Sequence, residues 1–402
     1  MRKKSTLIYL SSILFFISFS FNTKKNELKF IDQVFDKIEK QLNNISAKAD
    51  STKIPRSIHN DGSMYYAKVG DWTCGFFPGT LWYLYEFNGK KEWKDRASEW
   101  TRLLERVQYK STTHDIGFMM YCSYGNGYRL TKDSSFKPIL VQSAKTLLKR
   151  FNPKTGVIKS WDRQPFNKKW QNPVIIDNMM NLELLFWATK TTGDSTYYNI
   201  AKTHALTTMK NHFRKDYSSY HVVDYDSITG KVLQKNTHQG IADESSWARG
   251  QGWGLYGFTF CYRETKDPAF LTQAENIANL ILKHPNLPKD FIPYWDFNAI
   301  DIPNSARDAS AAALIASALI ELSTYDIKNK KEYFKAAEKM LISLSSSKYT
   351  AEVGTNNNFI LKHCTGNFPT GTEIDKPLNY GDYYYIEALV RYSKLLKGKS
   401  IL

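Results

Sequence analysis

Apolar residues recur every three to four positions along most of this chain, the spacing that places them on one face of a helix. The periodic segments predict about twelve helices. Their expected ranges are 27–44, 75–88, 91–110, 115–130, 135–150, 176–192, 195–212, 246–265, 268–284, 307–325, 331–346 and 382–396. Longer segments separate some of them, at 51–73, 151–173, 213–245, 286–305 and 348–381. None of these segments is rich enough in Pro, Gly and Ser to act as a domain linker, so we expect one domain.

A short pattern recurs within these helices: after a turn with a charged residue comes an aromatic residue, and alanine follows it four positions later. It occurs at Trp93/Ala97, Tyr197/Ala201, Phe270/Ala274 and Tyr333/Ala337, with a looser copy from Phe136 to Ala144. Residues at i and i+4 share a helix face, and the small residue lets a neighbouring helix approach. We therefore predict an all-α fold in which six helix hairpins close into an (α/α)6 barrel. An open α-solenoid is the alternative, but its repeat would be more regular.

The first twenty residues have the pattern of an export signal. An apolar run from 7 to 21 follows the basic residues Arg2, Lys3 and Lys4, and Ser18 and Ser20 are small residues suited to cleavage. The run is short for a membrane span. We expect residues 1–20 to be a signal peptide and residues 21–402 to form an exported protein, periplasmic or secreted, that does not stay inserted in a membrane. An uncleaved N-terminal anchor is the alternative.

The net charge of the chain limits the classes of molecule that it is expected to bind. The 402 residues include 55 Lys and Arg against 39 Asp and Glu, a net charge of +16 that becomes +13 without the basic start. Such a protein attracts nucleic acid, membrane surfaces or acidic polysaccharides. The lysines are scattered and no nucleic-acid module is recognisable, so nucleic acid is not the expected partner. An acidic glycan fits both the charge and the predicted export.

Cofactor and redox signals are weak in this chain. Cys74, Cys122, Cys261 and Cys364 lie far apart and form no CxxC pair. Because a chain of this length builds its core without disulfides, we expect four buried free thiols. The histidines do not have the spacing of helical metal ligands, and no Gly-rich phosphate loop occurs. We therefore expect neither a metal ion nor another cofactor.

Two aspartates, Asp115 and Asp177, each follow a loop and precede a helical run. Helix starts in one ring would aim both carboxylates at a single cavity, and paired carboxylates are typical of chemistry on sugars. The alternative is structural: Asp is a favoured N-cap because its oxygen accepts a backbone N–H of the first turn. The surroundings of the two aspartates therefore have to decide between these interpretations.

Aromatic and amphipathic residues are concentrated near the predicted helix starts. Trp72 precedes the second helix, and Arg249 and Trp253 are four residues apart in the eighth, so they share a face. Aromatic rings stack on the C–H faces of sugars, and Arg binds carboxylates. Core packing is the alternative for each tryptophan. His114, His221 and His238 are further candidates, although isolated histidines are more often structural.

The chain resembles the unsaturated glucuronyl hydrolases of glycoside hydrolase family 88. The resemblance rests on an ordered set of segments that spans residues 51–396: Asp71-Trp72-Thr73 with Gly75-Phe76, His114-Asp115-Ile116-Gly117-Phe118, Asp177-Asn178-Met179-Met180-Asn181, His238-Gln239-Gly240, Trp247 with Arg249-Gly250-Gln251 and Trp253, and Gly381-Asp382-Tyr383-Tyr384 with Glu387-Ala388-Leu389. Each segment alone is a weak signal, whereas the ordered set is specific. The resemblance implies an (α/α)6 barrel.

The resemblance also implies a reaction on fragments made by polysaccharide lyases. Such enzymes hydrate the vinyl ether between C4 and C5 of a terminal unsaturated uronic acid, which then rearranges and expels the neighbouring sugar. By motif, Asp177 is the general acid and base, and Asp115 is the second site carboxylate. The other matching positions, which assist water or bind substrate, are Trp72, His114, Asn178, His221, Gln239, Arg249 and Trp253.

Three other functions stay open at this point. A related unsaturated rhamnogalacturonyl hydrolase would share the barrel, but the second aspartate in His114-Asp115 favours the glucuronyl group. A non-catalytic glycan-binding protein would not need both aspartates, and a conventional glycosidase would hydrolyse saturated sugars. The segment 363–370 lies where the family contacts the second sugar and does not match residue by residue. A sulfated second sugar is a hypothesis that rests on net charge. The source polysaccharide and the oligomeric state are not indicated.

Overall fold

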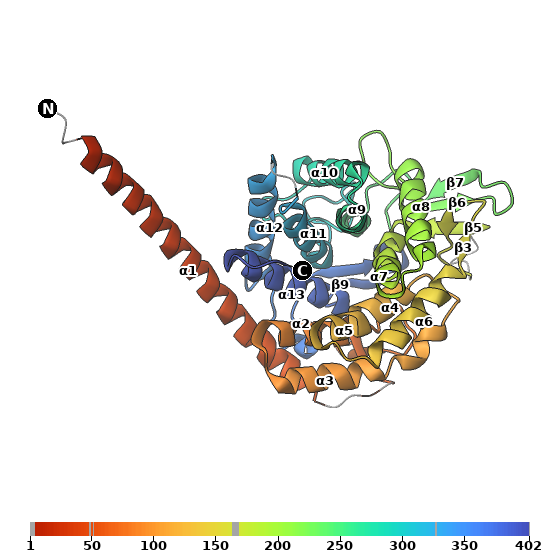
Figure 1. The fold of residues 1–402 in the computed structure, drawn as a ribbon, viewed down its shortest axis with the longest axis horizontal. Coiled ribbons are helices and arrows are strands. Elements are labelled where there is room, and N and C mark those ends of the chain that lie inside the picture. The colour runs from red at the N-terminus through yellow and green to blue at the C-terminus, as the bar shows by residue number, and fades with distance from the viewer. Residues whose placement is uncertain (1–4, 48–49, 51, 163–168, 326–327, 402) are drawn as a thin grey trace.

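The computed structural model describes residues 5–47, 50, 52–162, 169–325 and 328–401. Six inner helical segments form a ring: α2 (Phe76–Asn88), α4 (Ile116–Met120) continuing into α5 (Asn126–Thr131), α7 (Leu182–Thr192), α9 (Ala248–Thr265), α11 (Ala309–Leu322) and α13 (Asn379–Leu396). Each packs against the next, and α13 packs against α2, so the ring is closed (Figure 1). The predicted (α/α)6 barrel is therefore confirmed, and an open solenoid is excluded.

Six outer helices cover this ring. They are α3 (Lys91–Arg102), α6 (Phe136–Leu148), α8 (Ser195–Asn211), α10 (Pro268–Lys283), α12 (Lys330–Leu344) and α1 (Ser5–Ile45). The recurring aromatic–alanine pattern marks five of them, and all of its aromatic rings and alanines are buried. Inner helices such as α11 are instead buried on every side, with all fourteen of its residues inaccessible to solvent. The i, i+4 pattern therefore distinguishes outer helices, which need only one apolar face.

Short turns join α2, α5, α7 and α9 to the outer helices that follow them, at one end of the barrel. Gly89, Lys132, Gly193 and Lys266 adopt left-handed conformations there and end the inner helices. In two of these turns an aspartate begins the next helix: Asp194 accepts from the N–H of Thr196, and Asp267 accepts from the N–H of Ala269. These side chains satisfy N–H groups that a helix start leaves without partners.

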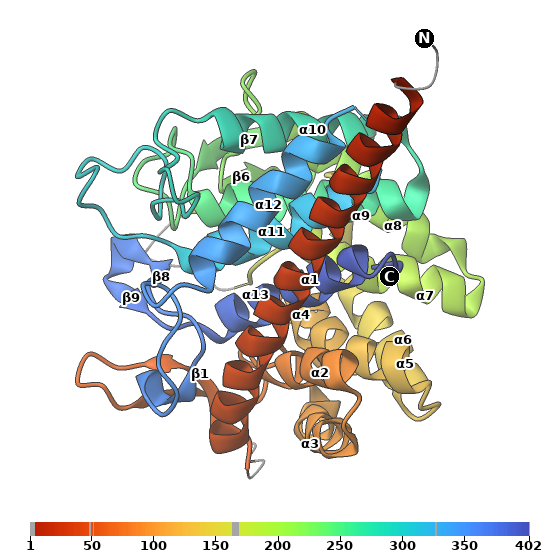
Figure 2. The same ribbon diagram turned by 90° about the vertical axis from the view of Figure 1, so that its left-hand side faces the viewer.

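The opposite end carries longer connections, which form small antiparallel sheets rather than the loops predicted from sequence (Figure 2). These pair β1 (Ile54–Ile58) with β2 (Met64–Ala67), β3 (Phe151–Asn152) with β4 (Val157–Ile158), and β8 (Cys364–Asn367) with β9 (Thr372–Lys376). A three-stranded sheet contains β5 (Asn172–Ile175), β6 (Val222–Tyr225) and β7 (Val232–Asn236). Strands of two to five residues show too little alternation to be recognised in a sequence.

Several helix boundaries differ from the predicted ones. The segment predicted at 115–130 is interrupted by a π-helical turn, Tyr121–Gly125. The segment predicted at 91–110 ends as a helix at Arg102 and continues as a 3-10 turn, Glu105–Tyr109. Other 3-10 turns span Ile176–Asn181 before α7, Asn356–Asn358 and Phe368–Thr370. Tertiary contacts, which the spacing of apolar residues does not contain, set these helix boundaries. At Gly117, for example, the chain passes so close to Asn181 that a Cβ atom would lie 2.5 Å from the Asn181 backbone.

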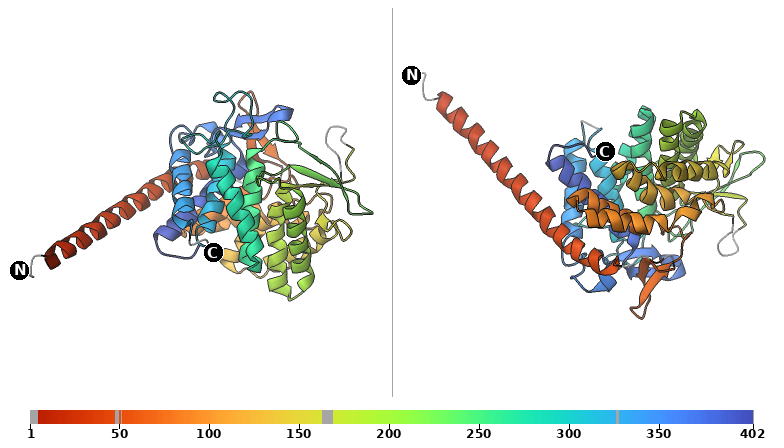
Figure 3. Two further views of the ribbon diagram at one scale, coloured as in Figure 1. Left: turned by 90° about the horizontal axis from the view of Figure 1, so that it is seen from above. Right: turned by 60° about the horizontal axis from the view of Figure 1, so that its bottom comes forward.

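Helix α1 is longer than predicted, and it extends away from the barrel at its N-terminal end (Figures 1 and 3). Its C-terminal half completes the outer layer by burying five apolar residues: Ile31, Val34, Phe35, Ile38 and Leu42. Within the described residues, no helix meets the length and hydropathy of a membrane span. The four cysteines are free and buried, as predicted.

Candidate active site

An open cavity lies at the end of the barrel that carries the small sheets. Its water-accessible volume is about 430 Å³. The residues that line it come from loops and helix starts widely separated in sequence: Arg56, Trp72, Asp115, Trp161, Ile175, Asp177, His238, Gln239, Arg249, Gly366, Asn367, Thr372, Glu373 and Tyr380. Both aspartates therefore face one cavity, together with four more of the residues proposed from sequence: Trp72, His238, Gln239 and Arg249.

Asp177 stands in the first turn after β5, where the chain enters the 3-10 turn Ile176–Asn181. Its side chain does not cap that turn, so the N-cap interpretation is wrong for this residue. Burial raises the pKa of Asp177 from 3.8 to about 7 against the opposing effects of His114 and Arg249, and Asp115 adds only a small further increase. Its Oδ2 atom has no hydrogen-bond partner among the described residues. Asp177 is therefore a buried acid that keeps its proton close to neutral pH.

The pKa of Asp115 is shifted in the opposite direction to that of Asp177. It occupies the N-cap position of α4, but its carboxylate accepts from the Thr113 hydroxyl at 2.5 Å rather than from the helix backbone. The Nε2 atom of His114 lies 3.1 Å from Asp115 Oδ1, at an angle unsuited to a regular hydrogen bond. Burial would raise the pKa of Asp115, but His114 and the Thr113 hydroxyl outweigh it and hold that pKa below 3.8. One carboxylate is thus charged while the other retains a proton.

His221 lies behind the cavity wall, and its hydrogen bonds define which ring nitrogen carries the proton. Its Nδ1 accepts the backbone N–H groups of His238 and Gln239, each at 3.1 Å, so the ring proton belongs to Nε2. That Nε2 faces Asp177 Oδ2 at 3.8 Å, which is too long for a hydrogen bond. Burial, then the neighbouring His238 and Arg249, lower the pKa of His221 well below 6.5. The imidazole therefore offers an N–H dipole to Asp177 without adding a charge.

Arg249 and Gln239 fix the strand on the far side of the cavity. Arg249 Nη1 donates to Asp308 Oδ2 at 2.6 Å and to the carbonyl of Thr365 at 2.5 Å, and its Nη2 donates to the carbonyl of Gly366 at 2.5 Å. Gln239 Nε2 donates to the same Gly366 carbonyl at 3.0 Å. Two residues that the sequence linked to substrate binding therefore also hold β8 in place.

An aromatic layer forms the floor of the cavity. Trp72 lines the cavity and packs against Tyr380 at a ring separation of 5.0 Å and against Phe118 at 5.8 Å. Trp253 is fully buried and lies against Phe118 at 5.2 Å and against Tyr384 at 5.5 Å. Trp253 thus supports the floor rather than facing the cavity.

Four residues proposed from sequence do not line the cavity. His114, His221 and Trp253 stand in the layer directly behind its walls. Asn178 is fully buried, and its amide donates to the carbonyl of Ile158 at 2.6 Å. Asn178 thus contacts the backbone beside β4, and its contact with substrate stays a prediction.

Sequence reasoning missed several lining residues. Arg56 and Glu373 come from β1 and β9, which lie more than 300 residues apart in the chain. Trp161 lies in a long connection and packs edge-on, at 5.7 Å, against His238, which was a candidate from the sequence and also lines the cavity. The only available signal was the abundance of aromatic residues in the long connections. Within the described ranges, no group of three His, Cys, Asp or Glu side chains has an arrangement that could hold a metal ion.

Comparison with known proteins agrees with this architecture. The sequence model of Glycosyl Hydrolase Family 88 matches residues 37–402. An unsaturated glucuronyl hydrolase of Formosa agariphila is 45% identical, with 98% of this chain and 100% of that protein covered. An unsaturated chondroitin disaccharide hydrolase of Streptococcus pneumoniae is 31% identical, with 98% of both chains covered.

Solved structures give the same result. The crystal structure of an unsaturated glucuronyl hydrolase specific for heparin is 51% identical and superimposes with a TM-score of 0.89 over 92% of this chain and 98% of that one. The unsaturated glucuronyl hydrolase of Bacillus sp. GL1 is 29% identical, with a TM-score of 0.84 over 90% and 96% of the two chains. From its sequence match, its fold and its paired buried carboxylates, this chain belongs to glycoside hydrolase family 88.

Proposed function

We propose that the protein releases 4,5-unsaturated uronic acid from the non-reducing end of lyase-generated oligosaccharides by hydrating the C4=C5 bond. The observation that carries this proposal is Asp177, a buried acid with a pKa of about 7 and a carboxyl oxygen without a partner among the described residues. Protonation of an enol ether carbon needs an acid that still holds its proton near neutral pH. The supporting relatives include enzymes named unsaturated glucuronyl hydrolase and unsaturated chondroitin disaccharide hydrolase.

In the proposed reaction, Asp177 transfers its proton to C4, and the π electrons of C4=C5 form the new C–H bond. A water molecule adds its oxygen to C5, which has become electron-poor, and its proton returns to the Asp177 carboxylate. The resulting C5 hemiketal opens to a ketone, and the neighbouring sugar leaves as its alcohol from C1. The acid is therefore regenerated in each cycle, and no cofactor is needed to balance the atoms.

The neighbours of Asp177 support this cycle. After proton transfer the carboxylate is negative, and the Nε2–H of His221, 3.8 Å from Oδ2, provides a dipole of the correct sign. Asp115 is held ionised by His114 and Thr113, so it can accept hydrogen bonds from ring hydroxyls. Trp72 provides a flat apolar surface for the sugar ring.

Turnover of lyase-generated unsaturated disaccharides tests this function directly. We expect the ultraviolet absorbance of the C4=C5 bond to disappear as the second sugar is released. The matching saturated disaccharide, with the same glycosidic bond, should be untouched. Hydrolysis of the saturated compound would establish a conventional glycosidase, and binding without turnover would establish a glycan-binding protein.

The second sugar is a separate question, because the relatives differ in it. One is described as specific for heparin, and a Streptococcus agalactiae enzyme variant was crystallised with dGlcA-GalNAc6S. An acidic oligosaccharide suits the net charge of +16. Preference for a sulfated second sugar has only this overall charge in its favour, so the local charges at the cavity mouth decide it.

We also propose that residues 1–20 direct export, with the mature enzyme acting in the periplasm. This proposal rests on the basic start and the apolar run. Among the residues of α1 whose side chains are described, 24–45, Leu28 and Phe30 are the first apolar residues packed against the core, beyond that segment. A chain that starts at Thr23 should therefore fold and remain active, but it should stay in the cytoplasm of the producing cell. Equal export of both chains, measured by cell fractionation, would exclude the signal.

A further inference from the structure

The mouth of the active-site cavity carries an arginine between two carboxylates. Arg56 of β1 donates from Nε to Glu373 Oε1 at 2.8 Å and from Nη2 to Glu373 Oε2 at 3.1 Å. Its Nη1 donates to Asp71 Oδ2 at 2.9 Å. Arg56 and Glu373 both line the cavity, and their side chains are 14% and 10% exposed. Because one guanidinium serves two carboxylates, the net charge of this group is negative.

The position of Glu373 is tightly determined by its surroundings. Its backbone has a φ of 54°, a left-handed conformation that costs a non-glycine residue free energy. Its Oε2 atom lies 2.6 Å from the place where a Cβ on Gly366 would stand. The carbonyl of that same Gly366 is held by Arg249 and Gln239. The Glu373 carboxylate therefore packs directly over the wall that the active-site residues fix.

Asn367 and Arg249 do not add a free cation to this wall. Asn367 lines the cavity, and its Oδ1 has no hydrogen-bond partner among the described residues. Arg249, the other guanidinium of the cavity, is committed to Asp308 and to two carbonyls. Among the described residues that line the cavity there is no lysine. The positive net charge of the whole chain is therefore not found at the mouth of the active-site cavity.

We propose that Glu373, held by Arg56, determines specificity for the second sugar. It selects sugars that present a hydroxyl or an ammonium group to this wall, and it disfavours those that carry a sulfate there. A hydroxyl or ammonium group donates to the carboxylate and to Asn367 Oδ1, whereas a sulfate has only acceptors and meets a net negative charge. The proposal rests on the proposed function, because it concerns the second sugar of the same substrate.

Kinetics on matched disaccharides test this inference. The panel contains unsaturated disaccharides that are unsulfated, O-sulfated or N-sulfated on the second sugar, or that carry a free amine there. For the wild type we expect kcat/KM to be at least about tenfold higher for the unsulfated and free-amine compounds than for the sulfated ones, with the difference mainly in KM. In Glu373→Gln this ratio should fall at least about fivefold. Higher salt should also reduce it, because screening weakens the repulsion.

Two further variants keep the inference testable if Glu373→Gln folds poorly. Asp71→Asn removes the other carboxylate on Arg56 without altering a cavity-lining residue, and it should shift the ratio in the same direction by a smaller factor. Glu352→Gln changes net charge equally at an exposed position and should leave the ratio unchanged. Melting temperatures of all variants control for folding.

The outcomes separate this inference from the proposed function. Absence of turnover on every unsaturated disaccharide would reject the proposed function itself. Turnover with equal kcat/KM on sulfated and unsulfated compounds would overturn only the role of Glu373. An unchanged ratio in folded Glu373→Gln and Asp71→Asn would overturn it as well.

Discussion

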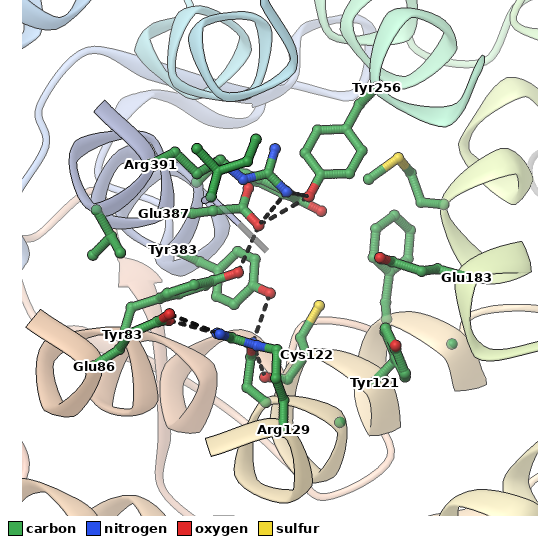
Figure 4. A pocket seen from close by; sticks show the side chains of 18 residues that line it. Tyr83, Glu86, Tyr121, Cys122, Arg129, Glu183, Tyr256, Tyr383, Glu387 and Arg391 are labelled. Atoms are coloured by element: carbon green, nitrogen blue, oxygen red, sulfur yellow. Dashed lines mark hydrogen bonds and ion pairs between the residues drawn. The ribbon is translucent and has the colours of Figure 1, made fainter. Parts of the chain in front are cut away.

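Two cavities lie within the ring of inner helices, and they treat polar groups differently. The open cavity lies at the N-terminal ends of these helices, and it contains Asp115 and Asp177. The second lies deeper, among the later turns of α2, α9 and α13, and has a water-accessible volume of about 90 Å³ against about 430 Å³ for the open one. Figure 4 shows Arg129 directed toward Glu86 and Arg391 directed toward Glu387.

Charged groups in the deeper cavity are paired. Glu387 accepts from the hydroxyls of Tyr83 at 2.6 Å and Tyr256 at 2.9 Å (Figure 4), and it also accepts from the Ser317 hydroxyl at 2.6 Å. Arg129 and Glu86 form a two-point pair at 2.7 and 2.5 Å. Within the described part of the chain, no buried side-chain nitrogen or oxygen lining this cavity lacks a hydrogen-bond partner. The acidic and basic groups of this cavity are therefore paired without a ligand.

Groups at the open cavity are incomplete by comparison. Asp177 Oδ2, His221 Nε2 and Asn367 Oδ1 all lack partners among the described residues. A buried polar atom without a partner costs about 1–3 kcal/mol, so folding alone does not favour such an arrangement. The difference teaches that burial of a carboxyl group by itself does not mark an active site here: the buried Glu387 is paired, whereas Asp177 Oδ2 beside the open cavity is not. The variants below test that distinction, from the largest expected effect to the smallest.

Replacement of Asp177 by Asn should have the largest effect. The amide cannot transfer a proton to C4, so we expect kcat to fall by about 10³-fold or more, with the fold retained. Loss of the C4=C5 absorbance measures the rate. Asp382→Asn is a matched control, because burial also raises the pKa of Asp382 to about 7 but this residue accepts from backbone N–H groups away from the open cavity. A similar loss of activity in both variants would contradict the distinction between the cavities.

Replacement of Glu387 by Gln should act on stability instead. It removes the charge that faces Arg391 at 3.4 Å and leaves a buried cation with one partner fewer. Breaking a buried pair in this way costs about 3–5 kcal/mol. Urea denaturation should show that loss, while kcat of the folded fraction stays within about twofold of the wild type. A tenfold loss of kcat in a folded Glu387→Gln protein would show that the deeper cavity takes part in the reaction.

The raised pKa of Asp177 predicts that both the reaction rate and the stability fall as pH rises, each over its own pH range. Because the reaction begins with protonated Asp177, kcat should decline as pH rises through about 7. For stability, the ordinary pKa of 3.8 applies to the unfolded chain and the raised value to the folded one. Below pH 3.8 the group is protonated in both states and costs nothing. Above that pH the unfolded chain ionises first, so the folded state becomes less favourable until both are ionised above about 7.

Asp177→Asn removes this cost. The variant should therefore be more stable than the wild type at pH 8, by up to about 4 kcal/mol at 1.36 kcal/mol per pKa unit, and the advantage should vanish near pH 3.5. Urea denaturation at the two pH values measures it. A variant that is less stable than the wild type at pH 8 would show that the Asp177 carboxylate has stabilising partners in the folded protein. Gain of stability with loss of activity would instead identify Asp177 as a site maintained for function.

The sequence predicted the parts of this molecule that depend on local spacing. Pairs such as Trp93 and Ala97 have the i, i+4 relation of one helix face, and they mark outer helices because only those need a single apolar side. Asp115 and Asp177 were found because each stands at a helix start within a distinctive short motif. These features require knowledge of only a few consecutive residues.

The mouth of the cavity depends on contacts that local spacing does not contain. Arg56 meets Glu373 because β1 and β9 are brought together by closure of the ring, when α13 packs against α2. The depth of a residue along its helix is likewise a property of the whole barrel. Arg249 and Trp253 share a face of α9, yet the arginine lines the cavity and the tryptophan lies one turn deeper, beneath Phe118.

The smallest effect on activity is expected for Trp253, which lies in the aromatic layer between the two cavities. Its indole Nε1 has no partner among the described residues, and its ring packs on Phe118 and Tyr384. Trp253→Phe loses no hydrogen bond and keeps an aromatic ring, so KM should change by less than about twofold, with a stability loss of about 1–2 kcal/mol from the smaller ring. Trp72→Phe is the matched variant on the cavity side, and its reduced stacking surface should raise KM by about fivefold. A larger rise in KM for Trp253→Phe than for Trp72→Phe would mean that the sugar reaches below Phe118, so that the aromatic layer opens and the two cavities communicate during the reaction.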